Sequence, residues 1–172
     1  MTKKFRILSL SLASAVKLNE IPSPLFETVG ARALENNCII VAAAGNDSSR
    51  PSLPKPVSTP ANSVSIMAVG AIDSQMKIAR FSNAGLNPVT GGNVNLCAPG
   101  VDVISLYPKN SKNKSGNYYA MSGTSMATPH VAGMLALYME KFPEKAAGEI
   151  WEWAESKARP IERLKYRTSE TD

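Results

Sequence analysis

The residues Gly-Thr-Ser-Met-Ala-Thr-Pro-His-Val-Ala-Gly at positions 123–133 combine a glycine turn, a helix start and a proline inside the same helix. Thr124 can cap a helix that runs from Ser125 through the apolar residues 134–139. The first turn of a helix has unpaired N–H groups and the positive end of the helix dipole, so the Ser125 hydroxyl lies where developing negative charge is stabilised. Pro129 removes an N–H from these turns, which we therefore expect to be distorted. A sequence built only for stability would be regular here, so the conflict indicates a functional segment.

These eleven residues resemble, at every position, the nucleophile segment of the subtilisin-like serine proteases. Taken alone, a serine at a helix start is most often a capping or first-turn residue. The complete string reverses that balance, and the resemblance implies that Ser125 is the nucleophile. Residues 123–127 also half resemble the nucleophile elbow of the α/β-hydrolases. That fold needs its acid and its histidine later in the chain, whereas the one histidine after Ser125 is His130, only five residues away.

A second motif is Ala42-Ala43-Ala44-Gly45-Asn46, which resembles the oxyanion segment of the same family. By itself, Gly-Asn after a strand is a turn. The resemblance implies that the Asn46 side-chain amide donates to the oxygen of the tetrahedral intermediate, a task that suits a neutral amide because it has no proton to lose. Ala43, Ala44 and Gly45 would then form one wall of a roomy, mostly apolar substrate pocket. Asp47 at the rim would bias that pocket toward basic side chains.

The N-terminus supports two interpretations. Residues 1–6 are basic, residues 7–16 are apolar and Ala-Ser-Ala at 13–15 looks like a cleavage site, which together imitate a short secretory signal peptide. Residues 5–12 also fit a buried strand, which we favour because the family has a strand ending in Ser-Leu-Gly here. The residues in that place are Ser11, Leu12 and Ala13, so the resemblance implies that they line the substrate cleft, with Ala13 departing from the family's glycine. The compartment stays open, secreted or cytoplasmic.

The first 44 residues predict a strand, a helix and a second strand. Ser23 and Pro24 start the helix by capping and by proline at its first position. Residues 38–44 form a continuous apolar run that is typical of a strand covered on both faces of a parallel sheet. Such a crossover unit places functional residues at the carboxyl ends of its strands. The helix has one expected apolar face, made of Leu25, Phe26, Val29, Ala33 and Leu34.

The rest of the chain extends this pattern. Residues 64–71 predict another strand, and residues 125–141 and 144–157 predict two helices. The resemblance covers residues 5 to about 158, and the charged tail 159–172 lacks the family's last strand. We therefore expect one partial subtilisin-like domain over residues 1–172. Its fold class is α/β, with three layers, a mostly parallel sheet and helices on both faces.

The turn Thr59-Pro60-Ala61 resembles a family turn that contains a cis proline beside the substrate pocket. We therefore predict a cis peptide bond between Thr59 and Pro60, although only about 5–6% of bonds before proline are cis.

Composition narrows the function further. The chain has 172 residues, of which 44% are apolar, enough to bury a core, and no run is long enough to cross a membrane. The net charge is +5, but the basic clusters at 109–114 and 157–167 lack interleaved aromatic residues, so we expect no nucleic-acid partner. Cys38 and Cys97 are expected to be buried free thiols, because no CxxC or His/Cys cluster occurs. We expect no cofactor and no metal site in this chain.

A serine nucleophile needs a base that a third group orients, usually His held by Asp. The only histidine is His130. Five residues along a helix rotate a side chain by about 500°, so His130 points roughly 140° away from Ser125 and is better interpreted as structural. In the family, the Asp and His motifs precede the strand that begins here at Phe5, and neither motif occurs in this sequence. The chain therefore looks like the carboxyl-terminal half of a subtilisin-like catalytic domain.

Three hypotheses remain open. The first is a serine endopeptidase acting on peptides or proteins, inactive alone, whose Asp and His come from an upstream segment or a separate chain. The second is an inactive pseudoprotease that binds extended peptides by strand addition. The third, a hydrolase with a lysine base, has no lysine near Ser125 in sequence. We favour the first, because a binder needs neither Ser125 nor Asn46. The family's stronger calcium site would belong mostly to the other half.

Overall fold

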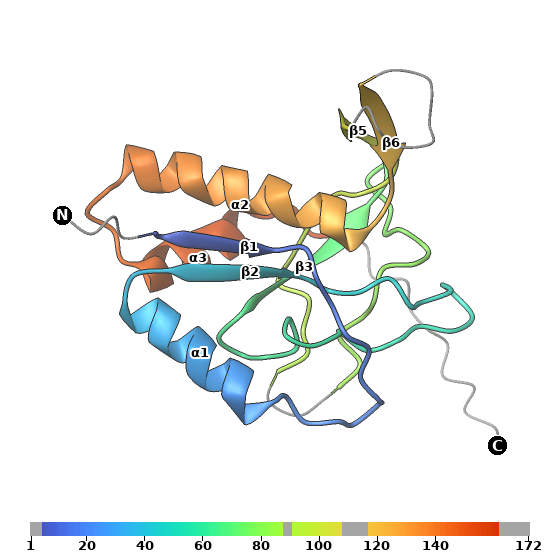
Figure 1. Cartoon of the computed structure of the whole chain (residues 1–172), viewed down its shortest axis with the longest axis horizontal. Helices are drawn as coiled ribbons and strands as arrows, with labels where there is room; N and C mark the ends of the chain where they lie inside the picture. Colours follow the sequence, from blue (N-terminus) through green and yellow to red (C-terminus); the bar gives the residue numbers. More distant parts are fainter. Residues whose placement is uncertain (1–4, 88–90, 108–116, 162–172) are drawn as a thin grey trace.

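The computed structural model describes residues 5–87, 91–107 and 117–161 (Figure 1). In this part of the chain a parallel sheet has the strand order β1-β2-β3-β4. Strands β5 and β6 form a separate antiparallel ribbon that projects from the body (Figure 1). The strands are β1 (Ile7–Leu10), β2 (Ile39–Ala43), β3 (Met67–Ile72), β4 (Leu96–Pro99), β5 (Val103–Leu106) and β6 (Tyr118–Met121), and the helices are α1 (Pro24–Glu35), α2 (Thr124–Lys141) and α3 (Ala147–Lys157).

Alternation along β2 divides the core into two layers. Ile39 and Val41 belong to a cluster that also contains the buried residues of α2 and α3. Ile40 and Ala42 belong to a second cluster, against which Ala33 of α1 packs. Helices α2 and α1 therefore lie on opposite faces of the sheet, above and below it in Figure 1. The predicted three-layer arrangement with a parallel sheet and helices on both faces is confirmed.

Helix α1 begins as expected, with Ser23 at the N-cap and proline at the first position, but the Ser23 hydroxyl makes no capping hydrogen bond. The expected apolar face is only partly buried, because exposed fractions are 68% for Leu25 and 47% for Val29. The helix instead approaches the body through Gly30, where a Cβ would lie 2.9 Å from the carbonyl oxygen of Ser65. In the described part of the chain no strand beyond β1 covers the remaining apolar residues of α1.

Three further expectations need correction. Thr124 does not cap α2, because Gly123 is the N-cap and Thr124 is the first helical residue. The two cysteines are free but only half-buried, and burial raises the pKa of both thiols. Strand β3 begins at Met67 rather than near Val64, since Val64 lies in a turn and is exposed.

Helix α2 continues through Pro129 to Lys141 without interruption. The peptide bond between Thr59 and Pro60 is cis, which confirms that prediction. No helix in the described ranges is both long and apolar enough to cross a membrane. The basic residues 109–114 and most of the charged tail lie outside the described residues.

Candidate active site

The three segments predicted to carry function meet where the carboxyl ends of β1 and β2 approach the start of α2 (Figure 1). Ser11 follows β1, Asn46 follows β2, and Ser125 lies in the first turn of α2. Hydrogen bonds join Asn46 to Thr124 and Ser11 to Ser125, although each pair is separated by more than 70 residues in sequence. A parallel sheet brings such distant residues together because its strands end at one edge.

Asn46 holds the first residue of α2. Its Oδ1 accepts hydrogen bonds from the Thr124 backbone N–H at 2.8 Å and from the Thr124 hydroxyl at 2.9 Å. The Thr124 hydroxyl in turn accepts from the Gly45 N–H at 3.2 Å. Because a backbone N–H can only donate, the atom of Asn46 that faces it must be the oxygen. The Asn46 NH₂ group is therefore the part of the amide that remains available to a ligand.

Two N–H donors lie close to Gly123. A Cβ built on Gly123 would lie 3.4 Å from Asn46 Nδ2 and 3.7 Å from the Ser125 backbone nitrogen. Neither donor has an acceptor within the residues that the structure describes. The Met126 sulfur also borders this Cβ position, at 3.6 Å. Two unpaired donors at a helix start are suited to bind an oxygen that carries negative charge.

Ser125 is half-buried and makes paired contacts with Ser11. The Ser125 hydroxyl donates to the Ser11 carbonyl oxygen at 3.3 Å, and the Ser11 hydroxyl donates to the Ser125 carbonyl oxygen at 2.8 Å. The end of β1 is thereby attached to the first turn of α2. The sequence analysis placed Ser11 at the substrate cleft and did not predict this contact. The available signal was Pro129, which lacks the N–H that would pair with the Ser125 carbonyl in a regular helix.

The segment after β1 is extended and open. Leu12 is 56% exposed and Ala13 is exposed. No backbone hydrogen bond in the described chain involves Leu12 or Ala13, whereas Ser14 exchanges two with Thr59, at 2.9 and 3.0 Å. Backbone groups that are free over two residues can pair with an added extended peptide. The methyl group of Ala13 causes no backbone strain, since Ala13 has no positive φ.

Ala43, Ala44 and Gly45 are buried, so the two methyl groups are not exposed on a cleft in the described chain. Their backbone groups are engaged as well: the Ala44 oxygen accepts from Ser58 and the Gly45 oxygen accepts from Asn83. Gly45 has a φ of +105°, and a Cβ there would collide with the side chains of Asn83 and Ser58. This segment thus has a fixed backbone that only glycine permits.

Asn83 is a supporting residue that sequence reasoning missed. It is 1% exposed, and its Oδ1 accepts from the Asp47 N–H and the Ser48 hydroxyl, each at 3.0 Å. Its Nδ2 donates to Ser58 and to the Asp47 carboxylate, each at 3.2 Å. These four bonds fix the loop that follows Asn46 and hold the exposed Asp47 in place. In the sequence Asn83 lies in a short run of small residues that suggests only a turn or a buried strand.

His130 lies on an exposed part of α2, and its Nδ1 is 2.8 Å from the Met126 carbonyl oxygen. Because a carbonyl only accepts, Nδ1 carries the proton. The ring is therefore bound to its own helix. No hydrogen bond joins it to Ser125 in the described part of the molecule.

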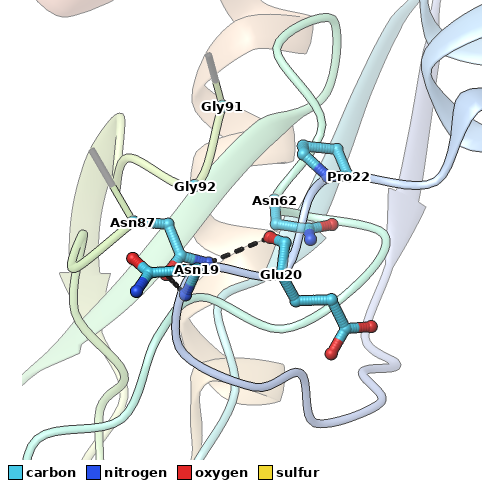
Figure 2. A pocket seen from close by; sticks show the side chains of 7 residues that line it. All are labelled: Asn19, Glu20, Pro22, Asn62, Asn87, Gly91 and Gly92. Atoms are coloured by element: carbon cyan, nitrogen blue, oxygen red, sulfur yellow. Dashed lines mark hydrogen bonds between the residues drawn. The ribbon is translucent and has the colours of Figure 1, made fainter. Parts of the chain in front are cut away.

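A small hollow lies apart from these residues (Figure 2). Asn87 there accepts from the Asn19 N–H at 2.7 Å and donates to the Glu20 carbonyl oxygen at 3.3 Å, so it ties the loop before α1 to the loop after β3. The hollow shares no residue with the predicted site. Among the described residues, no group of three or more His, Cys, Asp or Glu side chains is arranged to hold a metal ion.

Comparison with known sequences places this geometry in a family. The subtilase family model matches residues 1–170. Subtilisin DY from Bacillus licheniformis is 40% identical over 119 residues, which are 69% of this chain and 39% of that protein. Subtilisin E from Bacillus subtilis (strain 168) is 38% identical over 136 residues, which are 79% of this chain and 32% of that protein. The chain thus spans 32–39% of the length of these two curated relatives.

Solved structures agree with the sequence matches. Sphericase superposes with a TM-score of 0.73 at 26% identity, over 88% of this chain and 48% of that one. The prenylagaramide maturation protease PagA superposes with a TM-score of 0.72 at 28% identity, over 91% of this chain and 53% of that one. The expected subtilisin-like fold is confirmed. The family match over nearly the whole chain and the two subtilisins show that the chain belongs to the subtilase family of serine proteases.

Proposed function

We propose that this chain carries the nucleophile and the oxyanion-binding groups of a subtilisin-like serine endopeptidase. Ser125 attacks the scissile carbonyl, and the Ser125 N–H and the Asn46 amide stabilise the oxyanion that forms. The observation that carries this proposal is the presence of two unpaired donors close to Gly123, one of them on the serine itself. A capping serine with only a structural role has no need of a second amide oriented in this way.

Peptide or protein substrates would add as a strand alongside residues 11–13. The unpaired backbone groups of Leu12 and Ala13 support this role. Ala43, Ala44 and Gly45 would support the substrate pocket through their fixed backbone, as the buried methyl groups and the positive φ of Gly45 indicate. A binding mode that uses main-chain bonds fits an enzyme that accepts varied sequences.

The general base and its orienting acid would come from outside these 172 residues. The sequence has one histidine, His130, which lies five residues beyond Ser125 and whose ring is hydrogen-bonded to the Met126 carbonyl oxygen of the same helix. We therefore propose that an upstream segment or a separate chain supplies the Asp and the His. Without them the chain is inactive, because a serine hydroxyl is a weak nucleophile until a base takes its proton.

Exposed apolar side chains support a partner on the β1 side. We call them the open flank: Leu8, Leu12, Leu25, Phe26 and Val29, which are 37–68% exposed. They lie on β1, on the segment after it and on α1. Strand β1 is also the edge of the described sheet. A parallel strand added there would end beside Ser125, which is where a catalytic base must be.

The alternative is a pseudoprotease that binds extended peptides and cleaves nothing. The open backbone of Leu12 and Ala13 would serve such a binder equally well. The unpaired NH₂ group of Asn46, close to Ser125, favours the enzyme, since strand addition does not use it.

Labelling by an organophosphorus probe tests the proposal. The chain is mixed with the part of subtilisin E that carries the family's Asp and His motifs, and the site of labelling is mapped by mass spectrometry. Ser125 should be labelled, because its helix-start position and Asn46 stabilise the charged adduct. Labelling of another serine, or equal labelling of a Ser125→Ala variant, would remove the assignment.

A further inference from the structure

We infer that Ser11 is a positioning residue for the Ser125 nucleophile, because its hydroxyl binds a carbonyl group that Pro129 leaves without its helical partner. This role rests on the proposed function, since positioning matters only if Ser125 is the nucleophile. It is separate from the substrate contact that the family resemblance implies for Ser11, which would use the backbone of residues 11–13.

The helix geometry explains why the Ser125 carbonyl needs a partner. In an α-helix the N–H of residue 129 donates to the carbonyl oxygen of residue 125. Pro129 has no N–H, and a proline ring crowds the carbonyl four residues earlier. Helix α2 nevertheless continues through Pro129 to Lys141. The Ser11 hydroxyl supplies the replacement donor at 2.8 Å from the Ser125 oxygen.

The neighbouring carbonyl shows that the arrangement is specific to Ser125. The Thr124 carbonyl oxygen also accepts from a hydroxyl, but that hydroxyl belongs to Thr128 of the same helix, at 2.8 Å. Only the donor to Ser125 comes from outside the helix, from the end of β1. The Ser11 hydroxyl therefore fixes the nucleophile turn relative to the sheet, which a donor within the helix could not do.

The second contact orients the nucleophile side chain. The Ser125 hydroxyl donates to the Ser11 carbonyl oxygen at 3.3 Å. This distance is longer than an ordinary O–H···O hydrogen bond, so the proton is held weakly. The hydroxyl can then turn to a stronger acceptor such as a neutral imidazole. The Ser11 hydroxyl thus sets the position of Ser125, and the Ser11 carbonyl sets the resting direction of its Oγ.

The carbonyl ¹³C resonance of Ser125 tests this contact directly. Labelling serine carbonyls with ¹³C and methionine with ¹⁵N marks one peptide bond, since Ser125-Met126 is the only Ser-Met pair in the sequence. Ser11→Ala should move this resonance in the direction of a lost hydrogen bond. Ser11→Thr keeps the hydroxyl and should leave the resonance in place, as should the control Ser9→Ala on the exposed side of β1.

A Pro129→Ala background completes the test. It supplies a helical N–H for the Ser125 oxygen, so Ser11→Ala should move the resonance much less there than in the wild-type background. Solid-state spectra give the same comparison if the chain associates. An unchanged resonance in Ser11→Ala, or an equal change in both backgrounds, would overturn the inference.

The rate of labelling then tests the consequence for the nucleophile. In the chain supplied with the Asp and His segment of subtilisin E, Ser11→Ala should lower the maximal labelling rate by roughly 3- to 10-fold, as expected for one lost hydrogen bond. The half-saturating probe concentration should not change, and Ser11→Thr should restore the rate. A wild-type rate in Ser11→Ala would overturn the positioning role. If wild-type Ser125 is not labelled, the proposed function fails, and the ¹³C result still decides whether Ser11 holds the carbonyl.

Discussion

The junction between β2 and α2 differs sharply from the open flank. At the junction, Thr124 and Asn83 are at most 1% exposed, and their side chains make hydrogen bonds to neighbouring loop residues. On the open flank, Leu25 and Val29 are 68% and 47% exposed. The junction is packed and its buried polar side chains are hydrogen-bonded, whereas the two proposed oxyanion donors lack a partner in the described chain. The open flank instead presents apolar side chains to water. Large exposed apolar surfaces mark interaction sites.

This contrast shows which part of the proposed site this chain can form by itself. Residues that hold Asn46 and the start of α2 come entirely from this chain, so the proposed oxyanion site can form here. Ser11 lies at the end of β1, which is the edge of the described sheet. Ser125, the proposed nucleophile, therefore lies between the packed junction and the open flank. The following changes separate the two regions.

The largest effect is expected at Asn46. In the chain supplied with the Asp and His segment of subtilisin E, Asn46→Ala should lower turnover by roughly 10²- to 10³-fold. This range is known from subtilisin itself when its oxyanion asparagine is changed. Asn46→Asp is the matched control, because it keeps an oxygen to accept from the Thr124 N–H but loses the NH₂ donor. It should retain the stability of the wild type and still lose turnover, as steady-state kinetics and a thermal melt would show. A change in turnover within twofold would mean that Asn46 is only a turn residue.

A change at Thr124 should have a large effect on folding. Thr124→Val keeps the side-chain shape but removes the hydroxyl that accepts from Gly45 and donates to Asn46. Leaving the buried Gly45 N–H unpaired should reduce the free energy of unfolding by about 1–3 kcal/mol, measured by denaturant titration. Thr128→Val is the control, because it removes only a bond to a carbonyl of the same helix. An equal loss of unfolding free energy in both variants would show that the hydrogen bonds of Thr124 to Gly45 and Asn46 contribute no more stability than a bond within the helix.

The smallest effect on folding is expected on the open flank. Leu25→Gln and Val29→Thr should change the free energy of unfolding of the lone chain by no more than about 0.5 kcal/mol, because both side chains are already exposed. They should weaken binding of the subtilisin E segment and reduce self-association, as sedimentation would show. Leu135→Ala in the buried core is the contrast and should cost about 2–5 kcal/mol. Unchanged binding by the flank variants would remove the flank as a docking surface.

Sequence reasoning recovered the elements with a clear pattern. The apolar run at 38–44 predicts β2, and Ser23 with Pro24 predicts the start of α1. It also singled out Asn46 and Ser125, which the structure brings to one edge of the sheet, while their catalytic roles stay predictions. The elements were predictable because a run of apolar residues or a proline at a helix start is local in sequence.

The contacts between distant residues were not predictable. Thr124 was predicted to be a cap because threonine is favoured at that position, but in the fold the side chain of Asn46, in the loop after β2, accepts from the Thr124 N–H. The pairing of Ser11 with Ser125 depends on where β1 ends relative to α2. The exposed face of α1 depends on which strands lie beneath it. Each of these features is set by the tertiary arrangement, which local sequence preferences do not determine.

Peptide cleavage by the chain, with and without the Asp and His segment of subtilisin E, tests whether Ser125 is a nucleophile that needs a base from outside this chain. Residues 1–172 are purified as a monomer and assayed on a generic peptide while the Asp and His segment of subtilisin E is titrated in. We expect no cleavage by the chain alone and a saturable rise with the segment that Ser125→Ala abolishes, since the catalytic triad contributes on the order of 10⁶-fold to turnover in subtilisin itself. Ser125-dependent cleavage by the monomer alone would contradict this expectation.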